Sequence, residues 1–502
     1  MPNWSTCGCE EEGVPCIGER VPGFDRCLAH LGDGELPRAL EAVGPGASIN
    51  ARGTSFGPEL LERVLNAVGL PGRPVFGAAN FDYAHFDVAT PFRPDIWFAG
   101  DTVVRPAWLS LARFGGHVSF EGARFEGDAW FTGAEFEEDV NLRGARFAGV
   151  EQLGPFTASG RVLLDWATFA GSVVLEVSAP TLSCKRVTFE NDVILHAHRA
   201  AVDLSEARFL GFATVAGTTE PFQPLVPASG RKATVVPKPD RRAPHEVGDD
   251  PPPRVASLRG VDAGHLTLTG VDLSACRFAG TRRLDQLRVE DGCRFAGTPR
   301  GLQRGLRWPP IWWWTRRQTL AEEHAWRARR YNGVKGGWEA AVDRSGDVLA
   351  AGQLAVLYRQ LRKATEDVKN EPGAADFYYG EMEMRRMRDS GGRRLASWPE
   401  HMVVWLYWLV SGYGLRASRA LVALALTIAV SALLFDRFGF DPHQRPDAGP
   451  LLFAVESSIG LLRAPEPGTL TAGGHVVQIA LRLAGPLFFG LAILSLRGRV
   501  KR

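Results

Sequence analysis

The sequence predicts a β-solenoid that continues into an α-helical linker and an α-helical transmembrane hairpin. Three observations support this fold class. Large apolar residues recur every five or six positions through the middle of the chain, the pattern becomes helical after Arg304, and two long apolar stretches lie near the C-terminus. The 502 residues are enough for about three domains, so several distinct regions are expected.

The repeat unit consists of a small residue, a variable residue, and then Phe or Leu. Its spacing fits neither a helix nor a long alternating strand, but it suits a coil whose short sides each turn one large residue inward. The small residue shares the inward direction and the variable residue faces solvent, because side chains alternate in extended backbone. The clearest units are Ala112-Arg-Phe114, Ala123-Arg-Phe125, Ala129-Trp-Phe131, Ala134-Glu-Phe136, Val140-Asn-Leu142 and Ala145-Arg-Phe147.

These units resemble the pentapeptide-repeat family, whose fold is a right-handed quadrilateral β-helix. The resemblance covers residues 76–220 and resumes over 256–300, where Cys276 and Cys293 take the small inward position and are interpreted as packed core thiols. Steps of six residues depart from the family pattern, so we expect an irregular coil. Between the two blocks, residues 221–255 are rich in Pro and charge and are predicted to form a disordered insertion.

Residues 1–35 form a Cys/His-rich segment that resembles a zinc knuckle at its Cys27-Leu-Ala-His30 step. Zinc takes about four sulfur or nitrogen ligands, and a short segment with few apolar residues gains most of its order from such bonds. We therefore predict a structural zinc ion held by Cys9, Cys16, Cys27 and His30, with Cys7 as the alternate ligand. A reduced, disordered tail is the alternative interpretation.

Residues 36–75 are predicted to form a helical cap. Apolar residues between Pro58 and Leu70 follow a helical period, and a helix here would cover the N-terminal end of the solenoid.

A helical linker is predicted over residues 301–395. Its Trp308, Trp312–Trp314 and Trp326 are interpreted either as an interfacial belt or as a packing collar. Helices over Leu354–Val368 and about Ala375–Arg388 resemble a single tetratricopeptide-type hairpin. Glu381 and Glu383 lie two positions apart, so they do not share a helix face and are interpreted as solvated charge.

Residues 415–502 are predicted to form a transmembrane hairpin with a reentrant-like loop. Ala420–Phe435 and Val476–Leu496 are long apolar stretches, and basic residues flank both outer ends. The distribution of these charges and the lack of a signal sequence predict a multi-pass protein of the cell membrane with both termini in the cytoplasm. Residues 396–414 are predicted to form an aromatic helix lying in the interface, with a third, tilted span as the alternative.

The two spans and the loop between them resemble the layout of two-span potassium-type channels, but the filter signature of those channels is missing. Glu456 in the loop and Arg482 in the second span are membrane functional candidates, and we expect them to pair. Helix-to-helix packing or snorkelling of Arg482 is the alternative interpretation.

Composition and motifs favour an interaction protein. The chain has 58 Lys and Arg against 56 Asp and Glu, so nucleic acid is not an expected partner, although some members of the resembled family mimic DNA. Membrane lipid, an unidentified cytosolic protein and a second copy of the chain are the expected partners. No nucleotide-binding or hydrolase motif is present, so an enzyme is not predicted. A membrane-anchored scaffold is the leading hypothesis, and a channel-like or channel-derived sensor is the alternative.

Overall fold

The computed structural model describes residues 4–11, 14–70, 73–76, 78–86, 112–125, 131–222, 252–299, 302–304, 311–313, 315–330, 338, 348–387, 398–440, 449–459 and 470–500. The chain divides into two compact units. The first contains Met1–Leu349 and Lys363–Lys369, and the second contains Ala350–Arg362 and Asn370–Arg502. Most of the predicted insertion, residues 223–251, lies outside the described residues.

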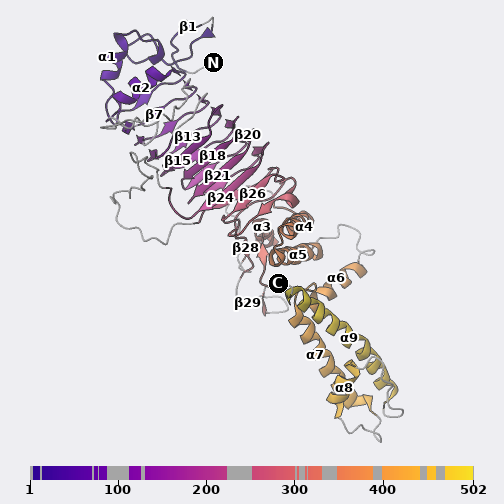
Figure 1. The fold of residues 1–502 in the computed structure, drawn as a ribbon. Helices are drawn as coiled ribbons and strands as arrows, with labels where there is room; N and C mark the ends of the chain where they lie inside the picture. The colour runs from indigo at the N-terminus through magenta and orange to yellow at the C-terminus, as the bar shows by residue number, and fades with distance from the viewer. Residues whose placement is uncertain are drawn as a thin grey trace. The chain divides into compact units, whose positions relative to one another are not determined.

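The first unit is a β-solenoid in which three sheets of short strands run along the coil (Figure 1). The first sheet contains β3 (Ile49–Asn50), β7 (Ala79–Asn80), β10 (Val118–Ser119), β13 (Val140–Asn141), β16 (Arg161–Leu163), β19 (Thr181–Ser183), β22 (Ala201–Asp203) and β25 (Arg254–Ser257). The second sheet contains β4 (Ser55–Phe56), β8 (His85–Phe86), β11 (Arg124–Phe125), β14 (Arg146–Phe147), β17 (Thr168–Phe169), β20 (Thr188–Phe189) and β23 (Arg208–Phe209). The third sheet contains β5 (Gly69–Leu70), β6 (Arg73–Phe76), β9 (Arg113–Phe114), β12 (Glu135–Phe136), β15 (Gln152–Ala158), β18 (Val173–Ser178), β21 (Val193–His198), β24 (Ala213–Thr218), β26 (Leu266–Thr269) and β27 (Arg288–Val289).

Strand pairing in these sheets is parallel, except that β5 pairs antiparallel with β6. The β-solenoid predicted from the repeat is therefore confirmed. The small and large residues of the units point inward: Ala145 and Phe147 are fully buried, whereas Arg146 between them is exposed. This arrangement follows from the alternation of side chains in extended backbone.

A ladder of phenylalanine rings runs through the core beneath the second sheet. Neighbouring rings lie nearly parallel, with centroids 4.5–5.5 Å apart. The ladder consists of Phe56, Phe86, Phe125, Phe147, Phe169, Phe189 and Phe209. Each coil therefore adds one ring, and the parallel register holds the rings in contact.

The coils differ in length, as the six-residue steps predicted. Phe125 pairs with Phe147, 22 positions further along, whereas Phe169 pairs with Phe189, 20 positions further along. The longer coil contains alternate steps of five and six residues. The coil is therefore irregular along its axis, and the register between β15 and β18 shifts at Leu153 and Phe156.

The N-terminal end of the solenoid begins earlier than residue 76. Strands β3 and β4 pair with β7 and β8, so the first coil starts at Ile49. Helix α2 (Pro58–Ala67) follows this coil and buries Leu61 and Val64. The amphipathic helix is where its period indicated, but it lies between two strands of the solenoid. A shorter helix, α1 (Glu35–Glu41), precedes it.

The C-terminal end of the first unit contains strands where a helix was predicted. After Arg304 the chain forms β30 (Ile311–Trp313), not a helix, because this segment pairs antiparallel with β29 (Leu302–Arg304). The first described helix of this region is α3 (Ala321–Arg330). The side chains of residues 301–314 lie outside the described residues, so the belt and collar interpretations of their tryptophans stay predictions. The elements here are η2 (Leu284–Gln286), β28 (Ala296–Gly297), β29 (Leu302–Arg304), β30 (Ile311–Trp313), β31 (Gln318–Thr319) and α3 (Ala321–Arg330).

The second unit is helical and includes two apolar helices. Helix α5 (Glu371–Arg386) begins directly after Asn370, whose side chain accepts a hydrogen bond from the Gly373 N–H as an N-cap. The helices are α4 (Ala351–Asp367), α5 (Glu371–Arg386), α6 (Trp398–Ser411), α7 (Ala417–Leu434), α8 (Gly449–Ile459) and α9 (Ala472–Val500), with a π-helical turn, η4 (Phe435–Gly439), after α7.

The interpretation of Glu381 and Glu383 as solvated charge is wrong. Both carboxylates are buried, because α5 packs against α4 at Gly380 and against α6 at Tyr379. Glu381 pairs with Arg385 at 2.5 Å, and Glu383 pairs with Arg386 at 3.1 Å. The Tyr413 hydroxyl also donates a hydrogen bond of 3.4 Å to Glu383. The charge of each acid is thus balanced inside the unit.

Candidate functional site

A β-hairpin near the N-terminus positions two of the candidate metal ligands. Strands β1 (Glu10–Glu11) and β2 (Val14–Pro15) pair antiparallel, and the Cys16 N–H donates to the Cys9 carbonyl at 2.7 Å. Further along the same ladder, the Cys7 N–H donates to the Gly18 carbonyl at 2.7 Å. The hairpin therefore brings the two ends of the C-x-C…C pattern side by side.

A short 3₁₀ helix supplies the other two ligands. Helix η1 (Leu28–His30) begins directly after Cys27, and residues three apart lie above one another in a 3₁₀ helix. His30 Nδ1 consequently lies 3.3 Å from Cys27 Sγ and 3.5 Å from Cys7 Sγ. Cys16 Sγ lies 3.8 Å from Cys27 Sγ.

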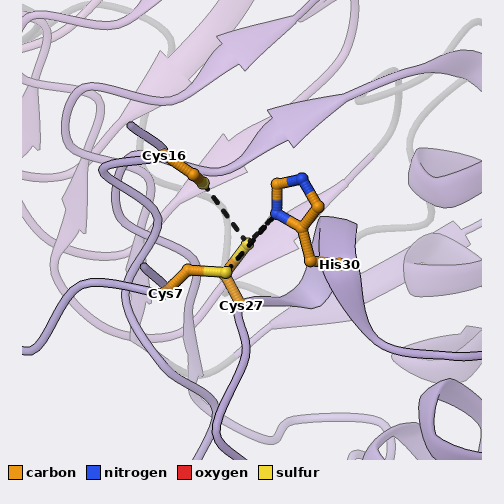
Figure 2. A group of neighbouring side chains, drawn as sticks. All are labelled: Cys7, Cys16, Cys27 and His30. Carbon is orange, nitrogen blue, oxygen red and sulfur yellow. Dashed lines mark hydrogen bonds between the residues drawn. The ribbon is translucent and has the colours of Figure 1, made fainter. Parts of the chain in front are cut away.

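The four side chains converge on one point (Figure 2). One ligand atom from each of Cys7, Cys16, Cys27 and His30 lies within 4.8 Å of every other. In a tetrahedral zinc site with Zn–S bonds near 2.3 Å and Zn–N bonds near 2.05 Å, sulfurs are about 3.8 Å apart and sulfur and nitrogen about 3.6 Å apart. The observed separations fit that geometry, so the cluster could hold a metal ion.

Backbone geometry closes tightly around the cluster. The Gly18 N–H donates to Cys16 Sγ at 3.3 Å. A Cβ atom on Gly18 would lie 2.7 Å from Cys27 Sγ, so a larger residue cannot be placed there without displacing a ligand. Glycine at this position thus lets the hairpin approach Cys27.

The environment acts differently on the thiols. Burial opposes ionisation of Cys7, but hydrogen bonds from backbone N–H groups of Cys27 and Cys9 lower the pKa of its thiol to about 6. Burial, followed by the nearby sulfurs of Cys16 and Cys7, raises the pKa of the Cys27 thiol. Three crowded sulfurs repel one another when ionised, and a divalent cation would offset that repulsion.

The ligand set differs from the predicted one at a single position. The structure brings together Cys16, Cys27 and His30 as expected, but the fourth member is Cys7, which was the alternate. Cys9 is partly exposed and lies next to Cys7, outside the group of four. The hairpin explains this choice, because it is Cys7 that reaches Cys27 and His30.

Two helices of the second unit are long and apolar enough to cross a membrane. The stretches are Ala417–Gly439 and Ala472–Ser495, and 22% of the residues in the most apolar window of each are buried. Helix α8 lies between the two spans in sequence. Its Ala454 packs in a cluster with Phe435, Phe440 and Leu481.

The membrane candidates lie on neighbouring helices. Glu456 is an exposed residue of α8, and Arg482 is a partly buried residue of α9. Their predicted pairing stays a prediction.

Comparison with known proteins supports the repeat. Residues 109–151 match the family model for pentapeptide repeats, with nine copies. No curated protein and no solved structure matches the chain at a significant level. The chain therefore carries pentapeptide repeats, and its remaining regions are interpreted from their own residues.

Proposed function

We propose that this pentapeptide-repeat chain is a membrane-anchored scaffold, in which the solenoid offers a binding surface and α7 and α9 hold the chain in a lipid bilayer. No catalytic role is proposed, and pentapeptide-repeat solenoids typically serve as structural or scaffold domains. Membrane lipid is one partner of this scaffold, and a cytosolic protein is the other. A second copy of the chain is a further partner to be tested.

The main support for a membrane location is the distribution of apolar and polar side chains on α7 and α9. Most of the exposed side chains in the middle of α7 and α9 are apolar, among them Leu426, Val430, Leu483 and Leu487, and the exposed Ser418 and His475 lie near the helix starts. The buried side chains include Ser431, Gln478 and Ser495. A helix on the surface of a water-soluble domain has the opposite arrangement, with its apolar side chains turned to the core. The arrangement in α7 and α9 is the one expected in a lipid bilayer. Apolar side chains then face the hydrocarbon, and polar side chains are turned to the protein interior.

Small residues between the helices support the same conclusion. A Cβ atom on Gly485 of α9 would lie 2.4 Å from the Ser458 carbonyl of α8, and one on Gly474 would lie 2.1 Å from the Gly439 carbonyl. Close backbone approach at small residues is typical of helices that associate in membranes.

Helix α6 fits a position at the membrane surface. It exposes an apolar stripe that contains Met402, Trp405, Leu406 and Leu409. Beside this stripe, Trp408 fixes the helix to the protein: its ring lies 4.2 Å from the Arg386 guanidinium, and its Nε1–H donates to the Tyr379 hydroxyl. The stripe would then face lipid while the other side packs on the protein.

Membrane fractionation tests the anchor. The full chain should stay in the membrane pellet after alkaline carbonate extraction, and a chain ending before Ala417 should be extracted. Reporter fusions within residues 441–448 should be on the outer side, and fusions at either end should be cytoplasmic. Release of the full chain by carbonate would refute the anchor.

The position of α8 between the two spans is the observation that favours the channel alternative. Helix α8 is short and apolar and packs against both spans, and the pore helix of two-span potassium-type channels takes a similar position in their layout. Planar-bilayer recording of the purified protein separates the alternatives: reproducible single-channel currents favour the channel, and their absence under a range of salts favours the scaffold.

We also assign a structural zinc ion to Cys7, Cys16, Cys27 and His30. Sulfur and imidazole donors in a tetrahedron suit zinc, and a set of four protein ligands leaves no open position for catalysis. Metal analysis should find one zinc ion per chain. Cys7→Ser should lose it, whereas Cys9→Ser should keep it, since Cys9 lies outside the cluster; equal retention by both variants would refute the assignment.

A further inference from the structure

The N-terminal module, here defined as the described residues from Trp4 to His30, lies against the first coil of the solenoid. Arg52, in the turn between β3 and β4, is at the centre of the contact. Its guanidinium lies 3.6 Å from the Glu19 carboxylate of the module and 3.8 Å from Asp82 of the next coil. It also lies 5.7 Å from the centre of the Trp4 ring. One cation therefore joins the module to two successive coils.

Backbone contacts bring the module to the end of the parallel ladder. The Glu19 N–H donates to the Arg52 carbonyl at 2.8 Å. Gly53 adopts a left-handed conformation with φ near +60°, and a Cβ atom there would lie 2.6 Å from the Ile17 carbonyl. The first coil lies at the end of the ladder, and the module supplies the N–H group that pairs with the Arg52 carbonyl in the turn of that coil.

Aromatic contact extends the interface. The Trp4 ring lies 5.8 Å from that of Tyr83, and Trp4 Nε1–H donates to the Ile17 carbonyl at 2.8 Å. Trp4 is thus held both by the module and by the corner of the second coil.

The residues that make these contacts lie beside the metal ligands in sequence. Trp4 precedes Cys7 by three positions, and Ile17 and Glu19 follow Cys16 by one and three positions. Within the described part of the module, the buried apolar side chains are Cys7, Cys27 and Leu28. So small a core cannot order the segment by apolar burial alone, and metal–ligand bonds would supply the missing stability.

We propose that the bound metal ion acts as a clasp, meaning that it holds the N-terminal module in the fold in which Trp4, Ile17 and Glu19 cover the first coil as a cap. Metal loading then decides whether that end of the solenoid is covered. This inference rests on the zinc site assigned above. Its chemistry requires a divalent, thiophilic cation, and its consequence is structural.

Hydrogen exchange of the full chain in lipid nanodiscs tests the clasp. The Glu19 N–H donates to the Arg52 carbonyl of the first coil and the Arg20 N–H donates to the Ser5 carbonyl within the module, so peptides covering these two residues report on the cap. Removing zinc with a chelator should raise their exchange rate by about tenfold or more, while peptides around Phe147 stay unchanged. Restoring zinc should reverse the effect.

Two arginine variants separate the clasp from the metal site. Arg52→Ala should keep one zinc ion per chain but raise exchange at Glu19, because the module loses its anchor. Arg63→Ala removes the same charge from the exposed side of α2, where it pairs with Glu59, and should leave that exchange unchanged.

The outcomes are distinct. A chain that binds one zinc ion, yet shows the same Glu19 exchange with and without it, overturns the clasp and leaves the zinc site standing. A chain that binds no zinc overturns both proposals. Exchange that rises on chelation in wild type and rises in Arg52→Ala with zinc still bound supports the clasp.

Discussion

Phe147 offers the most direct test of the phenylalanine ladder. Its ring is fully buried and stacks between Phe125 at 4.9 Å and Phe169 at 4.5 Å. Truncation of a buried Phe to Ala costs about 3–5 kcal/mol, and loss of two stacked partners places Phe147→Ala near the upper end, about 5 kcal/mol. Phe209, at the end of the ladder, is 9% exposed and, among the residues that the structure describes, stacks on Phe189 alone at 5.5 Å. We expect about 3 kcal/mol for Phe209→Ala.

Hydrogen exchange followed by mass spectrometry measures how much each alanine variant destabilises the coils around it. A gap of about 2 kcal/mol corresponds to about a 30-fold larger increase in exchange for Phe147→Ala. The increase should be confined to the coils around residue 147, because each coil contacts only its neighbours. Phe147→Leu, which copies the Leu used at residue 142, keeps an apolar side chain but loses both stacked contacts, so it should cost about 1–3 kcal/mol, less than Phe147→Ala. Equal effects of the two alanine variants would show that stacking does not set core stability.

Three further predictions concern other regions. Gly380→Ala should destabilise the α4–α5 pair by about 1–3 kcal/mol, because the new Cβ would lie 2.6 Å from the fully buried Tyr358 ring; unchanged exchange in α4 would contradict this. Burial raises the pKa of Glu322 above 4.5, despite hydrogen bonds from backbone N–H groups, so its contribution is fullest below pH 4.5 and is lost as pH rises through the folded-state pKa. Glu322→Gln should flatten that pH dependence of exchange near the C-terminal end of the solenoid. Finally, if Glu456 and Arg482 pair, the double charge swap should restore folded yield that each single reversal lowers, and failure of the swap would exclude the pair.

The repeat could be read from the sequence because its physical cause is local. Ala145-Arg-Phe147 alternates inward and outward within three residues, so the small, exposed and buried positions were all predictable. The apolar runs of α7 and α9 were equally visible, since length and hydropathy alone mark a span. The same holds for the helical period of α2 and for the concentration of cysteines before residue 30.

Other features depended on partners distant in sequence. The chain after Arg304 pairs as β-strands, and Glu381 and Glu383 are buried beside arginines; neither outcome follows from local periodicity. Helix α2 separates β3 and β4 from the next coil, so these two strands do not continue a run of repeats, and only their pairing with β7 and β8 placed them in the first coil.

The sequence by itself determined that this protein is a coil of short repeats with two apolar helices, because alternation, spacing and hydropathy act over a few neighbouring residues. Only the tertiary structure decided the fourth ligand of the candidate metal site and the contact of the module with the first coil. Cys7 and Cys9 are equivalent by spacing, and the positions of Cys27 and His30 in space distinguish them. Arg52 likewise looks like any turn residue until Glu19, Trp4 and Asp82 converge on it.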